Sequence, residues 1–211
     1  MENLQKLDEG LYRILIPFED LNTTVYIVRS PQGVAIIDAA TYASDIADFV
    51  LPALAQLGIG RGAVPHLLLT HAHDDHAGGL PALLEAFPHA PVQSITPFAL
   101  PEFSPLQDGD VILDRLQTVL LPGHTRLSCG FLDLPTGTLL SGDCLQLGGV
   151  GKYIHGIGYP ELYRASIKKL RAMDIHRIVA AHEFEPLGSI AEGSAQVQAY
   201  LDTCLELGGC V

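Results

Sequence analysis

Long apolar runs, paired cysteines and basic side chains are all scarce in this sequence of 211 residues. No stretch reaches the roughly 18 apolar residues that a membrane-spanning helix needs, so we expect no membrane partner. The four cysteines lack Cys-x-x-Cys spacing and are too few for a disulfide framework, which favours free thiols in a reducing compartment. The polar, acidic first ten residues lack the pattern of a signal peptide, so we predict a cytoplasmic protein.

Positively charged residues are also few. Only 12 Lys and Arg residues stand against 24 Asp and Glu residues, which gives a formal net charge of −12. Binding of DNA or RNA depends on clustered cations that neutralise phosphates, so we expect no nucleic-acid partner. The negative charge itself is explained well enough by solubility.

The apolar content is ordinary for a globular enzyme. Hydrophobic residues make up 48% of the chain and charged residues 17%, and no linker-like segment divides it. A chain of this length can bury one complete core, so we predict a single domain over residues 1–211. Its small size and the exposed loops expected between elements favour a homodimer.

Strand and helix patterns alternate along the chain. Short β-branched runs bounded by turn residues predict strands at residues 11–18, 24–29, 34–38, 66–70, 92–95, 111–113, 118–121, 129–134, 138–140 and 177–181. Helical periodicity predicts helices at residues 44–57, 77–87, 161–173 and 189–207, the first with Ser44 as its N-cap. This order predicts an α/β (α+β layered) fold, an αββα sandwich of two mixed β-sheets flanked by helices.

The most informative segment is His-x-His-x-Asp-His at residues 71–76, which is followed by Gly78 and Gly79. It falls on a predicted strand-to-helix loop, where a rigid scaffold can present side chains to a cleft. Three imidazoles and two carboxylates within six residues are hard to explain by the alternative interpretation, a solvated polar loop. Imidazole and carboxylate together suit zinc, so the segment predicts a metal site.

Three further polar side chains, His124, Asp143 and His182, each come just past a predicted strand. Taken alone, each would more often be a structural residue than a ligand. Strand ends gather at one edge of a layered α/β fold, so we expect all the candidate ligands to share one cleft. The full candidate set is His71, His73, Asp75, His76, His124, Asp143 and His182. Seven ligands suffice for two neighbouring metal ions that take three each and share one.

Other polar residues near these motifs have structural interpretations. Asp38 ends an apolar strand, where a carboxylate needs partners, so we predict that it holds a neighbouring loop by hydrogen bonds. Asp74 occupies the variable position of the motif and is expected to face solvent. Cys144 is predicted to be a small buried hydrophobe, although it adjoins Asp143.

These motifs resemble those of the metallo-β-lactamase fold superfamily, in its glyoxalase II and lactonase-like branch. His-x-His-x-Asp-His at 71–76 is followed by Pro-Gly-His at 122–124, Ser-Gly-Asp at 141–143 and Ala-His at 181–182, in the family's order and at compatible spacing. The resemblance covers nearly the whole chain, and it implies the αββα fold of that family.

The resemblance also implies how the ligands are divided. His71, His73 and His124 would hold one metal, Asp75, His76 and His182 the other, and Asp143 would bridge them. True class B β-lactamases carry Cys at the bridging position, so the Asp argues against antibiotic hydrolysis. Only 29 residues follow His182, so we expect the glutathione-binding helical extension of glyoxalase II to be absent.

We therefore predict a binuclear metal-dependent hydrolase with two divalent ions, with zinc favoured over iron or manganese. A metal-bridging hydroxide would attack the ester-like carbonyl of a small organic thioester or lactone. Asp75 would orient the hydroxide and carry the proton to the leaving group.

Two loops are predicted to form the substrate walls, the Pro-rich residues 96–108 and the Gly-rich residues 147–159. The second loop carries Tyr153, His155 and Tyr159. By similarity to a lactonase tyrosine, Tyr159 would donate a hydrogen bond to the substrate carbonyl. Simple loop packing explains these aromatic residues equally well.

Two alternatives stay open at this point. Persulfide dioxygenases of the same superfamily keep these motifs but use one iron, and the ligand types alone do not separate them from hydrolases. A non-catalytic metal-binding domain is the second alternative, and the complete ligand set argues against it.

Overall fold

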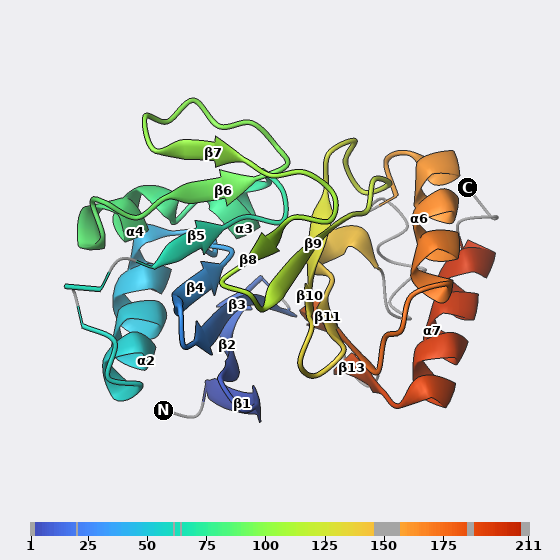
Figure 1. The fold of residues 1–211 in the computed structure, drawn as a ribbon. Coiled ribbons are helices and arrows are strands. Elements are labelled where there is room, and N and C mark those ends of the chain that lie inside the picture. Colours follow the sequence, from blue (N-terminus) through green and yellow to red (C-terminus); the bar gives the residue numbers. More distant parts are fainter. Residues whose placement is uncertain are drawn as a thin grey trace. The chain divides into compact units, whose positions relative to one another are not determined.

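The computed structural model describes residues 3–207 except 20, 61, 64, 146–156 and 185–187. The chain divides into two compact units, unit 1 (residues 1–106) and unit 2 (residues 107–211). Each unit has its own strands and helices (Figure 1). That the whole chain acts as a single domain stays a prediction.

The sheet of unit 1 joins an antiparallel meander to a parallel extension. Its strands are β1 (Leu4–Asp8), β2 (Leu11–Phe18), β3 (Leu21–Ser30), β4 (Gly33–Ile37), β5 (His66–Leu68), β6 (Val92–Ser94) and β7 (Phe103–Pro105). β1 to β4 pair antiparallel in chain order, and β4 to β7 pair parallel. The predicted meander is confirmed as β2 to β4, and β1 is an addition to it.

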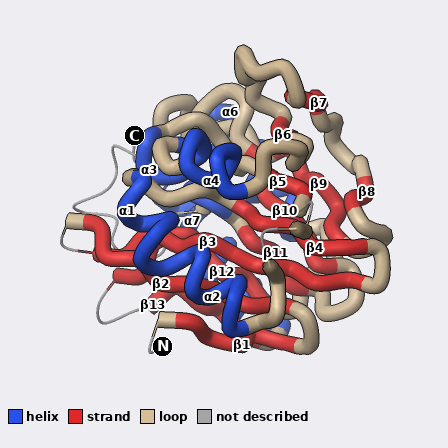
Figure 2. Tube along the Cα trace, turned by 90° about the vertical axis from the view of Figure 1, so that its left-hand side faces the viewer, coloured by secondary structure: helices blue, strands red, loops and turns tan. Residues whose placement is uncertain are grey.

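Helices cover one face of this sheet (Figure 2). They are α1 (Ala43–Asp45), the π-helical turn η1 (Ile46–Val50), α2 (Leu51–Gln56), α3 (Asp74–Ala77) and α4 (Leu80–Ala86). Val25 and Ile27 of β3 share one buried cluster with Ile46, Leu54 and Leu83 from the helices. This burial of apolar side chains is the main stabilising term of unit 1.

The helix predicted at residues 44–57 forms, but its predicted start is wrong. The helical path begins at Ala43, so Ser44 lies inside the first turn. The Asp45 carboxylate serves the helix start instead, because it accepts the backbone N–H groups of Thr41 and Tyr42 at 3.2 and 2.8 Å. Ser44 and Asp45 both have N-cap side chains, so local sequence does not decide between them.

The Pro-rich segment 96–108 contains a strand, so the prediction of a loop is wrong for β7. Pro105 cannot donate a backbone hydrogen bond, and it is tolerated because β7 is the edge strand of unit 1. Phe98, Leu100 and Phe103 are partly buried against the core of unit 1. Their apolar character therefore has a structural explanation.

The sheet of unit 2 is also mixed. Its strands are β8 (Val111–Ile112), β9 (Leu116–Leu120), β10 (Cys129–Asp133), β11 (Thr138–Leu140), β12 (Arg177–Phe184) and β13 (Gly188–Glu192), which pair in this order. All the pairs are antiparallel except β11 and β12, which run parallel. The 3-10 turn η2 (Gly142–Cys144) and the helices α6 (Pro160–Arg171) and α7 (Ser194–Leu207) complete the described part of unit 2. Ile167 of α6 and Leu201 of α7 share a buried cluster with Val119 and Ile178 of the sheet.

The end of the chain differs from the prediction in two ways. The last helix begins at Ser194, because residues 188–192 form β13. Ser189 and Ala191 are buried in alternation there, which is the period of a strand. β12 also continues to Phe184, so His182 lies within a strand and not beyond its end.

The predicted fold class is confirmed: the chain is α/β, with mixed sheets flanked by helices. Among the described residues, no helix combines the length and the apolar character needed to cross a membrane.

Candidate metal centre

Unit 1 brings together the four candidate ligands of its motif. His71 and His73 lie in the loop after β5, whereas Asp75 and His76 lie on α3. The His71 ring centroid is 4.6 Å from that of His73 and 4.2 Å from that of His76. His71 and His76 are fully buried, Asp75 is partly buried and His73 is exposed. Three imidazoles thus lie close together at one end of a parallel strand, where they could coordinate a metal ion.

A buried hydrogen-bond network orients this group. Asp38 accepts the Thr70 N–H at 2.8 Å, the Thr70 hydroxyl at 2.9 Å and Nδ1 of His76 at 2.7 Å. The predicted role of Asp38 as a loop-holding carboxylate is therefore confirmed. Asp38 adopts φ +64°, an unusual backbone conformation for a residue other than glycine.

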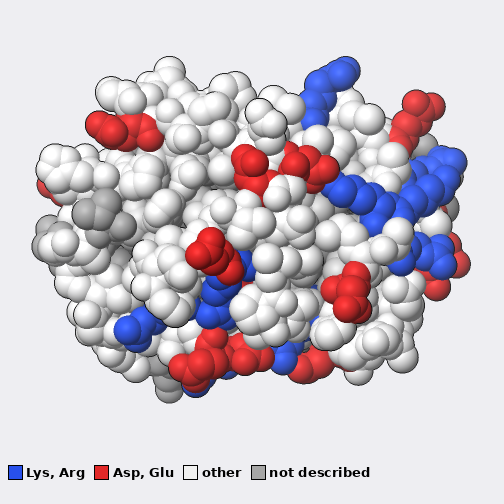
Figure 3. Space-filling model, in the orientation of Figure 1, with Lys and Arg blue, Asp and Glu red and all other residues white. Residues whose placement is uncertain are grey.

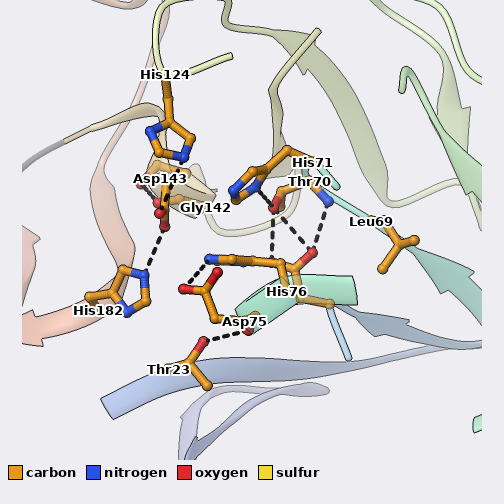
Figure 4. Close-up of polar contacts among 12 residues, drawn as sticks. Thr23, Leu69, Thr70, His71, Asp75, His76, His124, Gly142, Asp143 and His182 are labelled. Carbon is orange, nitrogen blue, oxygen red and sulfur yellow. Dashed lines mark hydrogen bonds and ion pairs between the residues drawn. The ribbon is translucent and has the colours of Figure 1, made fainter. Parts of the chain in front are cut away.

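The same network selects the ring form of His76. A carboxylate only accepts hydrogen bonds, so Nδ1 of His76 carries the proton that it donates to Asp38. In a neutral imidazole this leaves Nε2 with the lone pair that a metal needs. Nε2 of His76 lies 3.5 Å from Oδ2 of Asp75 (Figure 4). The Thr23 hydroxyl holds Asp75 in turn, because it donates to the Asp75 carbonyl at 3.1 Å.

The glycine pair after the motif has a packing role. A Cβ atom on Gly78 would lie 2.2 Å from the carbonyl oxygen of Thr41, and one on Gly79 would lie 2.1 Å from that of Ala39. Such distances are far inside van der Waals contact, so only glycine lets α3 and α4 approach this backbone. Ala39 N–H also donates to the His76 carbonyl at 2.6 Å, which fixes α3 to the end of β4.

Unit 2 brings together the other three candidate ligands from three separate segments. His124 lies in the loop after β9, Asp143 in η2 and His182 in β12. Oδ2 of Asp143 lies 3.6 Å from Nε2 of His124, and Oδ1 lies 3.2 Å from Nε2 of His182 (Figure 4). Each oxygen of one carboxylate therefore faces a different histidine.

These spacings fit side chains that share metal ions. Zinc binds His nitrogen and carboxylate oxygen at about 2.0–2.2 Å, so two such ligands in tetrahedral arrangement lie about 3.4 Å apart. The two contacts of Asp143 and the contact between Asp75 and His76 lie at 3.2 to 3.6 Å. The donor set of imidazole and carboxylate also matches a divalent transition metal.

The remaining predicted residues have varied outcomes. Tyr153 and His155 lie outside the described residues. Tyr159 directly precedes α6, and its ring lies beneath the Arg126 guanidinium, whose central carbon is 4.7 Å from the ring centroid. Asp74 is exposed and Cys144 is buried in the core of unit 2, as predicted.

Sequence reasoning missed two residues of this region, Thr70 and Arg126. Thr70 lies directly before the motif and reaches both Asp38 and Nδ1 of His71, the latter at 3.0 Å. Arg126 lies two residues after His124. The only sequence signal for either was its position beside a ligand.

The fold and the donor set indicate the class of protein: an α/β protein with a candidate metal centre of histidine and carboxylate side chains. The sequence model of the metallo-beta-lactamase superfamily matches residues 19–95. A metallo-beta-lactamase family protein from Thermus thermophilus has a similar fold, with a TM-score of 0.73 and 20% identity over 97% of this chain and 81% of that one. The chain carries a metallo-beta-lactamase superfamily domain.

Two curated proteins are similar to this chain at higher identity. The uncharacterized protein YobT of Bacillus subtilis is 34% identical over 150 residues, and the match covers 59% of this chain and 62% of the relative. A hydroxyacylglutathione hydrolase from a Synechococcus species is 33% identical over 169 residues, and the match covers 76% of this chain and 63% of the relative. The matched regions thus span about three fifths of the length of these relatives.

Proposed function

We propose that the chain is a metal-dependent hydrolase that acts on the ester-like carbonyl of a small organic thioester or lactone. The observation that carries the proposal is Asp143, whose two oxygens face His124 and His182 separately. This is the arrangement expected of a carboxylate shared by two metal ions. A relative at 33% identity is named hydroxyacylglutathione hydrolase, which supports thioester chemistry.

The proposed centre holds two divalent metal ions, with zinc favoured over iron or manganese. His71, His73 and His124 would bind one ion, Asp75, His76 and His182 the other, and Asp143 both. Bound metal ions would supply Lewis acidity and lower the pKa of a coordinated water molecule.

The chain's own residues would position the metal ligands and transfer the proton from the attacking water to the leaving group. Asp38 keeps the proton of His76 on Nδ1, so that Nε2 stays available as a ligand. Asp75 has its main chain fixed by Thr23, and its carboxylate would accept the proton of the attacking water and pass it to the leaving group. In this proposal the Tyr159 hydroxyl remains a candidate donor to the carbonyl oxygen.

Metal analysis combined with a substrate screen tests this proposal. Protein purified without added metal would be analysed for zinc, iron and manganese, then assayed against thioesters, lactones and phosphodiesters. We expect about two zinc ions per chain and saturable turnover of a thioester or lactone. One iron per chain, oxygen uptake with a persulfide and no hydrolysis would overturn the proposal in favour of an oxygenase. Bound metal with neither activity would favour a binding domain.

A further inference from the structure

Unit 2 contains a pocket that the metal ligands do not use. It has a volume of about 350 Å³ and is lined by Arg126, Gly158, Tyr159, Pro160, Glu161 and Leu162. A cavity of this size falls in the range that holds a small ligand or part of one. Its walls are a loop residue just past His124 on one side and the first turn of α6 on the other.

The guanidinium of Arg126 is held on an aromatic platform. Its central carbon lies 4.7 Å from the centroid of the Tyr159 ring, a cation–π distance. Within the part of the chain that the structure describes, Arg126 makes no ion pair with a carboxylate. Stacking occupies only the flat face of a guanidinium, so the N–H groups along its edge stay available. That edge matches the two oxygens of a carboxylate.

The pocket is fixed to the loop that carries His124. The Tyr159 N–H donates to the Gly123 carbonyl at 2.7 Å. A Cβ atom on Gly158 would lie 2.7 Å from the His124 carbonyl oxygen, so the two backbones are in close contact. Gly123 in turn fits against Tyr163 of α6, since a Cβ atom there would lie 2.6 Å from the Tyr163 Cα. A ligand in the pocket would therefore lie beside a candidate metal ligand.

The charges around the pocket favour an anion. Among the described residues, Glu161 is the one acidic side chain in the lining, and it is exposed, so solvent screens its field. Arg164 follows three residues later, which places it on the same side of α6 as Glu161. Lys and Arg side chains gather over α6 (Figure 3), but Lys169 and Arg171 in its last turn are paired with Asp108 and Asp202. Beside the pocket itself, Arg126 and Arg164 stand against Glu161, which leaves a small excess of positive charge.

We propose that this pocket binds a carboxylate carried by the substrate, with Arg126 as its charge partner and the Tyr159 ring as the platform. The inference rests on the proposed hydrolase function and narrows it to ester or thioester substrates with an anionic arm. It also gives the Tyr159 ring a role that is independent of the Tyr159 hydroxyl. Arg126 and Tyr159 are then specificity-determining residues.

Matched substrates test the proposal. One pair would be the acetyl thioesters of 3-mercaptopropionate and 3-mercaptopropionamide, and a second pair would carry the carboxylate or carboxamide on the acyl group. Each pair keeps the reacting carbonyl and changes only the charge of the arm. We expect wild-type protein to prefer one or both carboxylates, and Arg126→Gln to lower that preference in kcat/KM by about five- to tenfold.

Matched variants separate the pocket from general electrostatics. Arg164→Gln removes the same charge from α6 outside the pocket lining, and we expect it to change the preference less than about twofold. Tyr159→Phe keeps the platform and should keep the preference, whereas Tyr159→Leu should lower it. Both substrates of a pair have the same reacting carbonyl. Loss of a hydrogen bond from the Tyr159 hydroxyl to that carbonyl would therefore lower both kcat/KM values equally and leave their ratio unchanged.

A binding measurement keeps the outcomes distinguishable. Butyrate, but not butyramide, should shift the ring proton resonances of Tyr159 in the wild-type protein, and should do so at higher concentration in Arg126→Gln. If esters are hydrolysed but neither pair shows an Arg126-dependent preference for the carboxylate, the proposed carboxylate binding is wrong. The proposed hydrolase function would be unaffected. If no ester is hydrolysed, the proposed hydrolase function is wrong. The butyrate measurement would then test the carboxylate-binding pocket by itself.

Discussion

The two units supply candidate ligands in opposite ways. Unit 1 offers four of them within residues 71–76, on one loop and the short helix after it. Unit 2 gathers three from a loop, a 3-10 turn and the interior of a strand. The ligands of unit 1 are thus set by local sequence, whereas those of unit 2 depend on the correct folding of a whole sheet.

The contacts that hold the candidate ligands in place also differ between the two units. In unit 1 the buried carboxylate of Asp38 links Thr70 and His76 by short hydrogen bonds. In unit 2 the loop of His124 packs its backbone against the start of α6. An uncharged side chain also holds it, because the Ser166 hydroxyl donates to the Pro122 carbonyl at 2.7 Å. The comparison predicts that removing one charge behind the ligands impairs the candidate ligands of unit 1 through Asp38. The His124 loop of unit 2 depends instead on close backbone packing.

The largest effect is expected from Asp143→Ala in unit 2. This change removes the carboxylate that faces both His124 and His182, so both proposed ions lose a ligand. We expect kcat/KM to fall by more than about 100-fold, beyond the range for residues that only orient a ligand, and the metal content to fall with it. Asp174→Ala is the matched control, because it removes an exposed aspartate that pairs with His176. Full activity with both metals retained in Asp143→Ala would sink the assignment.

A smaller effect is expected from Asp38→Asn in unit 1. The variant keeps the size of the side chain but removes the charge that holds the His76 proton on Nδ1. We expect metal affinity, measured by competition with a chelator, to fall by about 10- to 100-fold. Asp45→Asn is the control, since it alters a carboxylate of the same unit that accepts hydrogen bonds at the helix start. Equal losses in both variants would mean that Asp38 acts through general stability.

Gly79→Ala should affect folding in unit 1 more than chemistry. Its Cβ atom would lie 2.1 Å from the Ala39 carbonyl oxygen, so the backbone between β4 and α4 must move apart. We expect the free energy of unfolding to fall by about 2 kcal/mol, in the range typical of overpacking. Gly60→Ala is the control, because no atom lies within 4 Å of its Cβ position. Chemical denaturation of the two variants measures the difference, and similar values for both would contradict the steric explanation.

Local signals explain what the sequence could predict. The His-rich motif, the β-branched runs of β2 to β4 and the amphipathic pattern of α6 are each complete within a few residues. Such patterns can be recognised within a short window of sequence. The strand-end rule then placed His124 and Asp143 near their true positions, because those segments do end in tight turns.

Contacts between distant segments explain what it could not predict. Residues 188–192 contain one β-branched side chain, and only pairing with β12 makes them a strand. The same pairing carries His182 inside a strand. The hydrogen bond by which Asp38 sets the His76 ring form links residues that are 38 positions apart. The contact of Arg126 with the Tyr159 ring links segments that lie before and after two strands. No local pattern records such pairs.

The smallest effect is expected at the surface of unit 2, where Lys169 of α6 binds Asp108 at 2.7 Å and 2.8 Å. Burial alone raises the pKa of the Asp108 carboxyl, but the hydrogen bonds from Lys169 and the Leu120 amide, with the Lys169 charge, lower it below the ordinary value of 3.8. A carboxyl with a depressed pKa in the folded state stabilises the fold above its ordinary pKa. That contribution is lost as the pH falls through the folded-state pKa.

Lys169→Met should therefore lower the free energy of unfolding at pH 7 by less than about 1 kcal/mol, because both groups are more than one-third exposed to solvent. The difference from wild type should shrink as the pH drops below 3.8. Lys168→Met is the control, since Lys168 is an exposed neighbour on the same helix. Denaturation of all three proteins across this pH range measures the effect. A loss well above about 1 kcal/mol at pH 7, or one that does not shrink at low pH, would contradict a solvent-screened ion pair at this surface.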